Sequence, residues 1–219
     1  AQEAVRFLVG RGADAVIIAC NTATAVAVEM LRSEYDLPII GMEPAVKPAV
    51  EETVQKRIMV IATPVTLREE KLKNLIARVD GMHRVDLLPL PKLVSFAERE
   101  EFESEEVLDY LEEELGTYNV QDYSALVLGC THFNYFKPQY RRIFGDGIAL
   151  IDGRRGTVRH LSELLHIACI SDTDEKKQLS EKEIGDFGTQ FFFSGIPADD
   201  AGIAHCMRLL KRLEAIRYV

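Results

Sequence analysis

Residues 13–24 read Ala13-Asp14-Ala15-Val16-Ile17-Ile18-Ala19-Cys20-Asn21-Thr22-Ala23-Thr24. The run is short, apolar and rich in branched aliphatic residues, and at its cysteine it passes into polar residues typical of the start of a helix. This pattern predicts a strand buried on both faces, as in parallel sheets. We therefore expect Cys20 at the carboxyl end of a strand and beside a helix N-terminus, a position that favours a thiolate.

The pattern occurs a second time, in Tyr123-Ser124-Ala125-Leu126-Val127-Leu128-Gly129-Cys130-Thr131-His132. In open α/β sheets, ligands bind at the carboxyl edge of the strands. Two cysteines placed in this way would flank one small substrate. The alternative is that both are core cysteines, since free cysteine is among the most buried residue types. The repeated context favours a site.

Short apolar runs alternate with helical patterns along the rest of the chain. Strands are predicted at residues 15–19, 37–42, 57–62, 85–88, 123–130, 148–152 and 190–194. One continuous helix is predicted from about Thr66 to Val79, and an amphipathic helix over Ala198–Leu213 closes the chain. This alternation predicts an α/β fold with mostly parallel sheets.

The composition excludes several classes of function. A formal net charge of −9 gives no basic surface for nucleic acid. No apolar run approaches the ~20 residues that span a bilayer, and the N-terminus lacks the pattern of a secretion signal. We therefore expect a cytoplasmic protein with no membrane and no nucleic-acid partner. Four cysteines without CxxC spacing predict neither a disulfide framework nor a metal site.

One histidine stands apart from the other four. His132 follows Cys130 by two residues, where it would orient or activate that thiol or contact a substrate carboxylate. The remaining histidines, His83, His160, His166 and His205, fall on helices or turns without an evident partner and are interpreted as structural. Cys169 and Cys206 lie among apolar helical residues and are interpreted as inert packing.

Two thiols facing one pocket suit the inversion of a stereocentre without a cofactor. One base removes the α-proton from one face, and an acid delivers a proton to the other face. The intermediate carbanion needs hydrogen-bond donors aimed at the substrate carboxylate. Asn21, Thr22 and Thr131, together with nearby backbone amides, are candidates for these donors.

Several segments resemble the ordered signature of bacterial glutamate racemase. The matching segments are Ala19-Cys20-Asn21-Thr22-Ala23, Gly41-Met42-Glu43-Pro44-Ala45, Ala62-Thr63-Pro64-Val65-Thr66, Leu128-Gly129-Cys130-Thr131-His132-Phe133, Leu150-Ile151-Asp152-Gly153 and Phe193-Ser194-Gly195. The resemblance extends over nearly the whole chain, with both cysteine motifs in the expected order.

The resemblance implies a cofactor-independent interconversion of L- and D-glutamate that supplies D-glutamate for peptidoglycan. The two catalytic acid/bases would be Cys20 and Cys130. The positions that match the family's substrate contacts are Asn21, Thr22, Thr63, Thr66, Glu98, Thr131 and His132, Glu98 being matched through Pro91-Lys92-Leu93-Val94-Ser95-Phe96-Ala97-Glu98. Glutamate is the expected small-molecule partner, and a homodimer is an open alternative to a monomer.

The resemblance also implies two pseudo-symmetric α/β lobes with the site at their interface. Residues 1–43 and 153–219 would form the first lobe, and residues 44–152 the second. The family normally begins with a further strand and an Asp-Ser-Gly motif ahead of the point at which this chain opens on Ala1, so we expect a truncated copy. Asp152-Gly153-Arg154-Arg155 and Asn134-Tyr135 also depart from the family pattern. The alternatives are an aspartate racemase-type relative and an inactive fragment that acts as a binding module.

Overall fold

The computed structural model describes residues 1–53, 56–168 and 188–216. Its first elements are α1 (Gln2–Gly10), β1 (Val16–Ile18), α2 (Asn21–Glu34), β2 (Ile39–Gly41), α3 (Val46–Glu52), β3 (Arg57–Ala62), α4 (Pro64–Arg68), α5 (Glu70–Val79) and β4 (Val85–Pro89). They are followed by α6 (Lys92–Glu98), α7 (Glu105–Leu115), η1 (Val120–Asp122), β5 (Tyr123–Leu128), η2 (Thr131–Phe136), α8 (Lys137–Phe144), β6 (Ala149–Asp152), α9 (Arg154–Leu165), β7 (Phe192–Phe193), β8 (Ile196–Pro197) and α11 (Asp200–Ala215).

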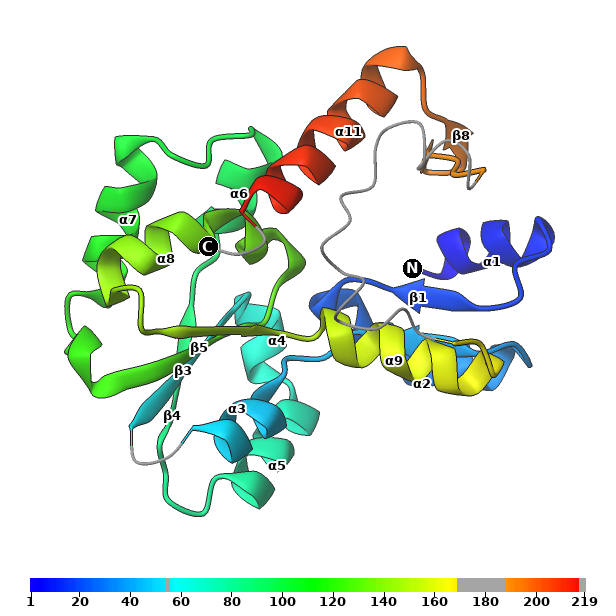
Figure 1. Ribbon diagram of the computed structural model, residues 1–219. Coiled ribbons are helices and arrows are strands. Elements are labelled where there is room, and N and C mark those ends of the chain that lie inside the picture. Colours follow the sequence, from blue (N-terminus) through cyan, green and yellow to red (C-terminus); the bar gives the residue numbers. More distant parts are fainter. Residues whose placement is uncertain (54–55, 169–187, 217–219) are drawn as a thin grey trace.

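The large sheet has the strand order β4-β3-β5-β6 and is parallel throughout. Helices cover both of its faces (Figure 1), so the inner strands β3 and β5 are almost completely buried. Side chains of α6, α7, η2 and α8 fill one face, and those of α3, α4 and α5 fill the other. A parallel sheet covered on both faces explains why these strands are continuous apolar runs.

The small sheet pairs β1 with β2 in parallel, with Val16 beside Ile39 and Ile18 beside Gly41. Val16 and Ile18 pack with residues of α1 and α2. Ile17 lies between them on the opposite side of the strand and remains 36% exposed. The expectation that this strand is buried on both faces was therefore wrong, because only one face of β1 is packed by the described residues.

The chain crosses between the two sheets twice, and the two crossings touch. One crossing leaves β2 through Glu43, and the other leaves β6 through Gly153. A Cβ atom added at Gly153 would lie 2.6 Å from the carbonyl oxygen of Glu43. Only glycine permits this approach. After the second crossing, α9 packs beside β2.

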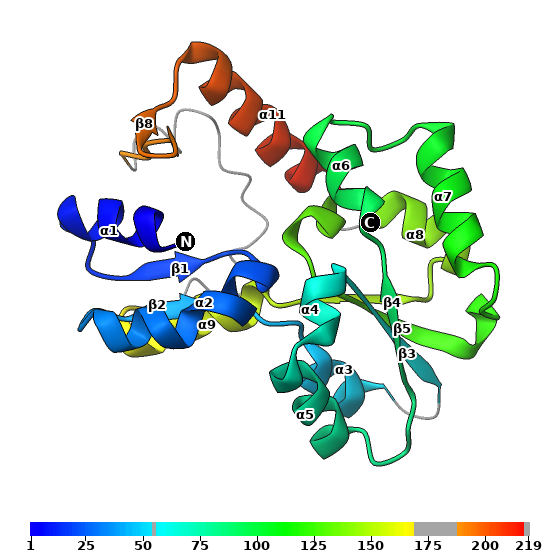
Figure 2. The same cartoon turned by 180° about the vertical axis from the view of Figure 1, so that it is seen from behind.

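The C-terminal part of the chain contacts both sheet units (Figures 1 and 2). The antiparallel hairpin β7–β8 lies on α1, with the Phe192 and Phe7 rings 5.0 Å apart. The guanidinium of Arg11 lies 4.8 Å from the Phe192 ring centroid and donates a 2.9 Å hydrogen bond to Gln190. From this hairpin, α11 runs to η2, beside the large sheet. The C-terminal segment therefore spans the distance between the two units.

The predicted α/β class with mostly parallel sheets is confirmed. The helix predicted over residues 66–79 is in fact two helices, because Glu69 adopts an extended backbone (φ −62°, ψ 128°) between α4 and α5. The strand predicted at 190–194 is only the two-residue β7. The helix η2 directly after Cys130 was not anticipated.

Candidate active site

Cys20 follows β1 and is the N-cap residue of α2. Its backbone is extended, and its Sγ accepts a hydrogen bond of 3.4 Å from the backbone N–H of Ala23. The side chain occupies the place that serine or aspartate takes in an ordinary N-cap. Cys20 is a free, solvent-exposed thiol at a helix N-terminus, as the sequence predicted.

Cys130 follows β5 and precedes η2 in the same way, but it is buried. Burial raises the pKa of the Cys130 thiol to about 11, and the N–H groups of His132 and Phe133 lower it only in part. The expected thiolate at this position was therefore wrong, because the cost of burying a charge exceeds the stabilisation by the backbone donors. At neutral pH, Cys130 is a protonated thiol.

The two cysteines are near enough to interact electrostatically. A charge on Cys20 contributes to raising the pKa of Cys130. Both side chains lie just beyond the carboxyl end of a parallel strand, Cys20 from the small sheet and Cys130 from the large sheet. The two predicted acid/base residues therefore come from different sheets and lie in one neighbourhood.

His132 connects Cys130 to Glu98. The Nδ1 atom of His132 lies 3.9 Å from the Cys130 Sγ, and its Nε2 atom lies 2.7 Å from Oε1 of Glu98. Glu98 is the last residue of α6. Its contact with His132 therefore adds α6 to the elements that surround Cys130. A carboxylate on one ring nitrogen orients the imidazole toward whatever faces the other nitrogen.

Three threonine hydroxyls form a closed triangle beside Cys20. Thr22 Oγ1 lies 2.8 Å from Thr63 Oγ1 and 3.1 Å from Thr66 Oγ1, and the last two are 3.1 Å apart. Thr63 is the N-cap of α4, which places the triangle between the first turn of α2 and the start of α4. Each hydroxyl can donate or accept, so the triangle can reorient toward a carboxylate.

Asn21 and Thr131 occupy matching places in the first turns after the two cysteines. Asn21 is 4% exposed, and its Oδ1 has no hydrogen-bond partner within the described structure. Thr131 is partly exposed, and its carbonyl accepts a 3.3 Å hydrogen bond from Nδ2 of Asn134. Buried unpaired acceptors are uncommon in folded proteins. The Oδ1 of Asn21 is enclosed by protein atoms, so the role of Asn21 as a substrate contact stays a prediction.

The structure also brings together charged residues that the sequence did not single out. Glu100 pairs with His205 and Arg208, and Glu103 pairs with Arg212. The interpretation of His205 as a histidine without a partner was wrong, since its Nδ1 lies 2.8 Å from Oε1 of Glu100. His160 also has a partner, since its Nδ1 lies 3.8 Å from Oε2 of Glu163. The partners are about a hundred positions apart, so no local pattern could have indicated them. Cys206 is a free, partly buried thiol, and Cys169 lies outside the described residues.

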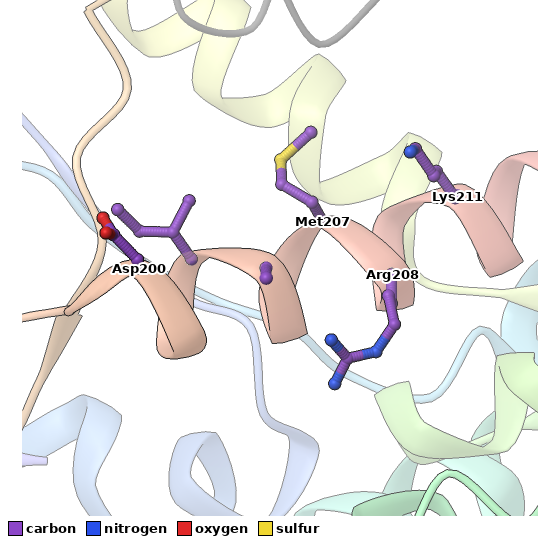
Figure 3. Close-up of a pocket in the computed structure, with 6 residues that line it drawn as sticks. Asp200, Met207, Arg208 and Lys211 are labelled. Carbon is purple, nitrogen blue, oxygen red and sulfur yellow. The ribbon is translucent and has the colours of Figure 1, made fainter.

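A surface hollow of about 360 Å³ lies along α11 and not at the cysteines. Its lining residues are Asp200, Ile203, Ala204, Met207, Arg208 and Lys211, and Figure 3 shows Met207 and Arg208 leaving the helix on different sides. In the described ranges, no three His, Cys, Asp or Glu side chains are grouped to hold a metal ion. No helix there is long and apolar enough to cross a membrane.

Comparisons with known proteins identify the family of the chain. A family model described as Asp/Glu/Hydantoin racemase matches residues 1–161. A glutamate racemase of Lachnospira eligens is 45% identical over 220 residues, which cover 99% of this chain and 80% of the relative. One from Halothermothrix orenii is 52% identical over 163 residues, which cover 74% of this chain and 64% of the relative.

A solved structure of Escherichia coli glutamate racemase, in complex with L-glutamate and the activator UDP-MurNAc-Ala, superposes with a TM-score of 0.66 at 29% identity. The superposition covers 76% of this chain and 64% of that one. The chain thus spans less than two thirds of two of these three proteins. The match to the family model and the 45% identity to the Lachnospira protein establish the family. The chain belongs to the Asp/Glu/Hydantoin racemase family.

Proposed function

We propose that this chain interconverts L- and D-glutamate by acid–base catalysis with Cys20 and Cys130. The observation that carries the proposal is the pair of cysteines. Each follows a parallel strand, each precedes a helix, and the charge of one affects the pKa of the other. The names of the curated relatives supply the substrate.

The proposed reaction needs one proton acceptor and one proton donor on opposite faces of the α-carbon. One sulfur removes the α-proton as its C–H bond breaks, and the electron pair stays on carbon, delocalised into the carboxylate. The other sulfur gives its proton to the opposite face, which forms the new C–H bond. The roles are exchanged for the reverse direction. Burial keeps Cys130 in its thiol form, which suits it to donate.

His132 and Glu98 support the proton transfer at Cys130. The imidazole faces the thiol with one nitrogen and the Glu98 carboxylate with the other. In the direction in which Cys130 acts as the base, a histidine held in this way can take the thiol proton first, which leaves the thiolate that removes the α-proton. In the opposite direction the thiol keeps its proton until it gives it to the α-carbon. The distance of 3.9 Å between Cys130 Sγ and His132 Nδ1 is longer than the 2.7 Å contact between His132 and Glu98. Catalytic hydrogen bonds are often long without substrate, and we expect this one to shorten when substrate binds.

We assign substrate binding to the residues that surround the two thiols. The triangle of Thr22, Thr63 and Thr66 supplies hydroxyl donors for the α-carboxylate, where negative charge accumulates after proton removal. Thr131 supplies a further hydroxyl at the start of η2. Asn21, in the first turn of α2 directly after Cys20, is assigned to the site by its position.

We also propose the lobes, the cellular compartment and the oligomeric state of the protein. Residues 1–43 with 153–219, and residues 44–152, are proposed as the two lobes, with the site between them. The described cysteines are free thiols, which supports a reducing cytoplasm, and D-glutamate would serve peptidoglycan synthesis there.

A homodimer is proposed through the exposed apolar side chains Val26 and Met30 of α2. Sedimentation of wild type and of Val26→Glu tests it, and the variant should sediment as the smaller species.

The test is racemisation of each enantiomer, followed by circular dichroism without added pyridoxal phosphate. We expect Cys20→Ser and Cys130→Ser each to lower turnover by roughly 10²- to 10⁴-fold, the usual contribution of a positioned acid or base. Cys206→Ser, on α11, is the matched control and should keep wild-type turnover. In D₂O, early product should carry deuterium at the α-carbon and recovered substrate should not.

Four results would contradict the proposal. Near-normal turnover in either site variant would remove that cysteine from the mechanism. Dependence on added pyridoxal phosphate would replace the two-thiol reaction. Faster turnover of aspartate than of glutamate would assign the aspartate reaction instead, and no turnover of either by the wild-type chain would leave a binding protein.

A further inference from the structure

Helix α6 ends at Glu98 in an unusual backbone conformation. The N–H of Glu100 donates to the Ala97 carbonyl at 3.0 Å, and the N–H of Glu101 donates to the Phe96 carbonyl at 2.9 Å. Glu100 itself has a φ of 57°, in the left-handed region that glycine normally occupies at this point of a helix end. Glutamate rarely adopts this backbone conformation, so contacts with neighbouring residues must stabilise it at Glu100.

The surroundings of Glu100 come from α11. Arg208 donates two hydrogen bonds to the Glu100 carboxylate, from Nη2 at 2.7 Å and from Nε at 3.1 Å. His205 lies on the same carboxylate through Nδ1, at 2.8 Å. The Arg208 contact is a two-point fork, the strongest arrangement of an arginine on a carboxylate. Its hydrogen bonds, with those of His205, lower the pKa of Glu100 to about 2.

A third residue of the same face of α11 continues the contact. Arg212 pairs with Glu103, lies 5.3 Å from the centroid of the Phe102 ring and donates a 3.4 Å hydrogen bond to the carbonyl of Tyr135. His205, Arg208 and Arg212 are spaced three and four residues apart, so they share one helix face. This face holds the segment after α6 and also reaches η2.

These two segments carry the Glu98–His132 pair. Glu98 is two residues before Glu100, and His132 is in η2, three residues before Tyr135. The 2.7 Å contact between Glu98 and His132 therefore depends on two chain segments that α11 fastens together.

We propose that Glu100 is a positioning residue: clamped by His205 and Arg208, it fixes the end of α6 so that the Glu98 carboxylate meets His132. The inference rests on the proposed function, because His132 acts there on Cys130. Glu100 touches neither thiol and takes no part in proton transfer. Its contribution is to the orientation of the imidazole.

The competing reading is that Glu100 is an ordinary surface ion pair, which would contribute little. Two variants separate the readings. Glu100→Gly removes the carboxylate but suits the left-handed backbone better than glutamate does. Glu100→Gln keeps the length of the side chain and removes its charge. Glu101→Gln is the matched control, since Glu101 pairs locally with Arg99 and has no described contact with α11.

If the clamp positions Glu98, Glu100→Gly and Glu100→Gln should both lower kcat by roughly 2- to 30-fold, the range of moderate coupling between contacting segments, with KM nearly unchanged. Arg208→Gln should lower kcat similarly and add little to Glu100→Gln, because the two remove one interaction. The ring ¹⁵N resonances of His132, assigned with His132→Asn, should shift in the Glu100 variants and not in Glu101→Gln.

Wild-type kcat together with unshifted His132 resonances in Glu100→Gly would overturn the proposal. Additive losses in Arg208→Gln and Glu100→Gln would also overturn it, because the two would then act separately. The resonance measurement needs no turnover. If the wild-type chain does not racemise glutamate, the proposed function fails, while the His132 shift still decides whether Glu100 holds the Glu98–His132 contact.

Discussion

Gly129 is the residue on which the position of Cys130 depends most directly. It lies between the last residue of β5 and the cysteine, and its N–H donates a 2.8 Å hydrogen bond to the carbonyl of Ile61 in β3. A Cβ atom at this position would lie 2.9 Å from that carbonyl oxygen and 2.9 Å from the Cβ of Ala62. Gly129→Ala therefore forces a methyl group between two strands that are already in contact.

The size of the effect follows from these distances. Non-bonded carbon atoms rest at about 3.5–4.0 Å, so the two Cβ atoms must separate by roughly 0.6–1 Å. Strand β3 is an inner strand buried on both faces and cannot yield, so the segment that carries Cys130 moves. Overpacking of this kind costs about 1–3 kcal/mol, and a displacement near 1 Å at the thiol lowers turnover about 10²-fold.

Urea unfolding and racemisation followed by circular dichroism measure the two effects separately. Gly156→Ala is the control, because Gly156 lies in α9 with nothing within 4 Å of an added Cβ. It should stabilise the fold by about 0.5–1 kcal/mol through helix propensity and leave turnover unchanged. A Gly129→Ala protein with wild-type stability and turnover would refute the argument that this glycine sets the position of Cys130.

Three further predictions test the described contacts. Because the pKa of Cys130 is raised from 9.0 to about 11, the folded state holds its proton where the unfolded state loses it. The free energy of unfolding should thus fall by about 2–3 kcal/mol as pH rises from 9 to 11. Urea unfolding of wild type and of Cys130→Ser measures this, because the variant lacks the thiol. An equal fall in both proteins would contradict the raised pKa of Cys130. Thr66→Val should cost about 1 kcal/mol through two lost hydroxyl contacts and raise KM for glutamate; an unchanged KM in steady-state kinetics would remove Thr66 from the binding site. The hydrogen bonds of Arg208 and His205 lower the pKa of Glu100 from 4.5 to about 2, so the clamp is complete above pH 4.5 and is lost as pH falls toward 2. The protection factors of the α11 amides, which are exchange rates relative to the intrinsic rate at each pH, should therefore fall over that range more in wild type than in Glu100→Gln. An equal fall in the two proteins would argue against the clamp.

Both cysteine positions followed from the sequence because their causes are local. Strand β1 lies within the predicted range 15–19 before Cys20, and the run before Cys130 forms β5, since branched apolar residues in short runs suit parallel strands. Burial of one cysteine and not the other was not predictable. It depends on the core cluster to which Cys130 belongs, and α6 and α7 contribute to that cluster from distant parts of the chain.

The break at Glu69 and the clamp at Glu100 show what local patterns leave out. Neither position carries the glycine or proline that usually marks a break or a left-handed residue. The extended backbone of Glu69 ends α4. Thr66, in the last turn before Glu69, contacts Thr22 of α2, which is distant in the chain. Glu100 adopts its conformation with partners more than a hundred positions away. In both places tertiary contacts outweigh backbone preference.

The relative placement of Cys20 and Cys130 rests on contacts of the same long-range kind. Two chain crossings touch at Glu43 and Gly153, which leaves the sheets a narrow covalent connection. The hydroxyl triangle then joins α2 to α4 beside Cys20, and α11 joins the hairpin on α1 to the segment after α6 beside His132. The threonine triangle and the Glu100 ion pairs are polar contacts near the surface, so neither stabilises the arrangement strongly alone. The proposed acid–base chemistry on two faces of one carbon requires a fixed separation of the two sulfur atoms, and in this chain that separation is set by several contacts acting together.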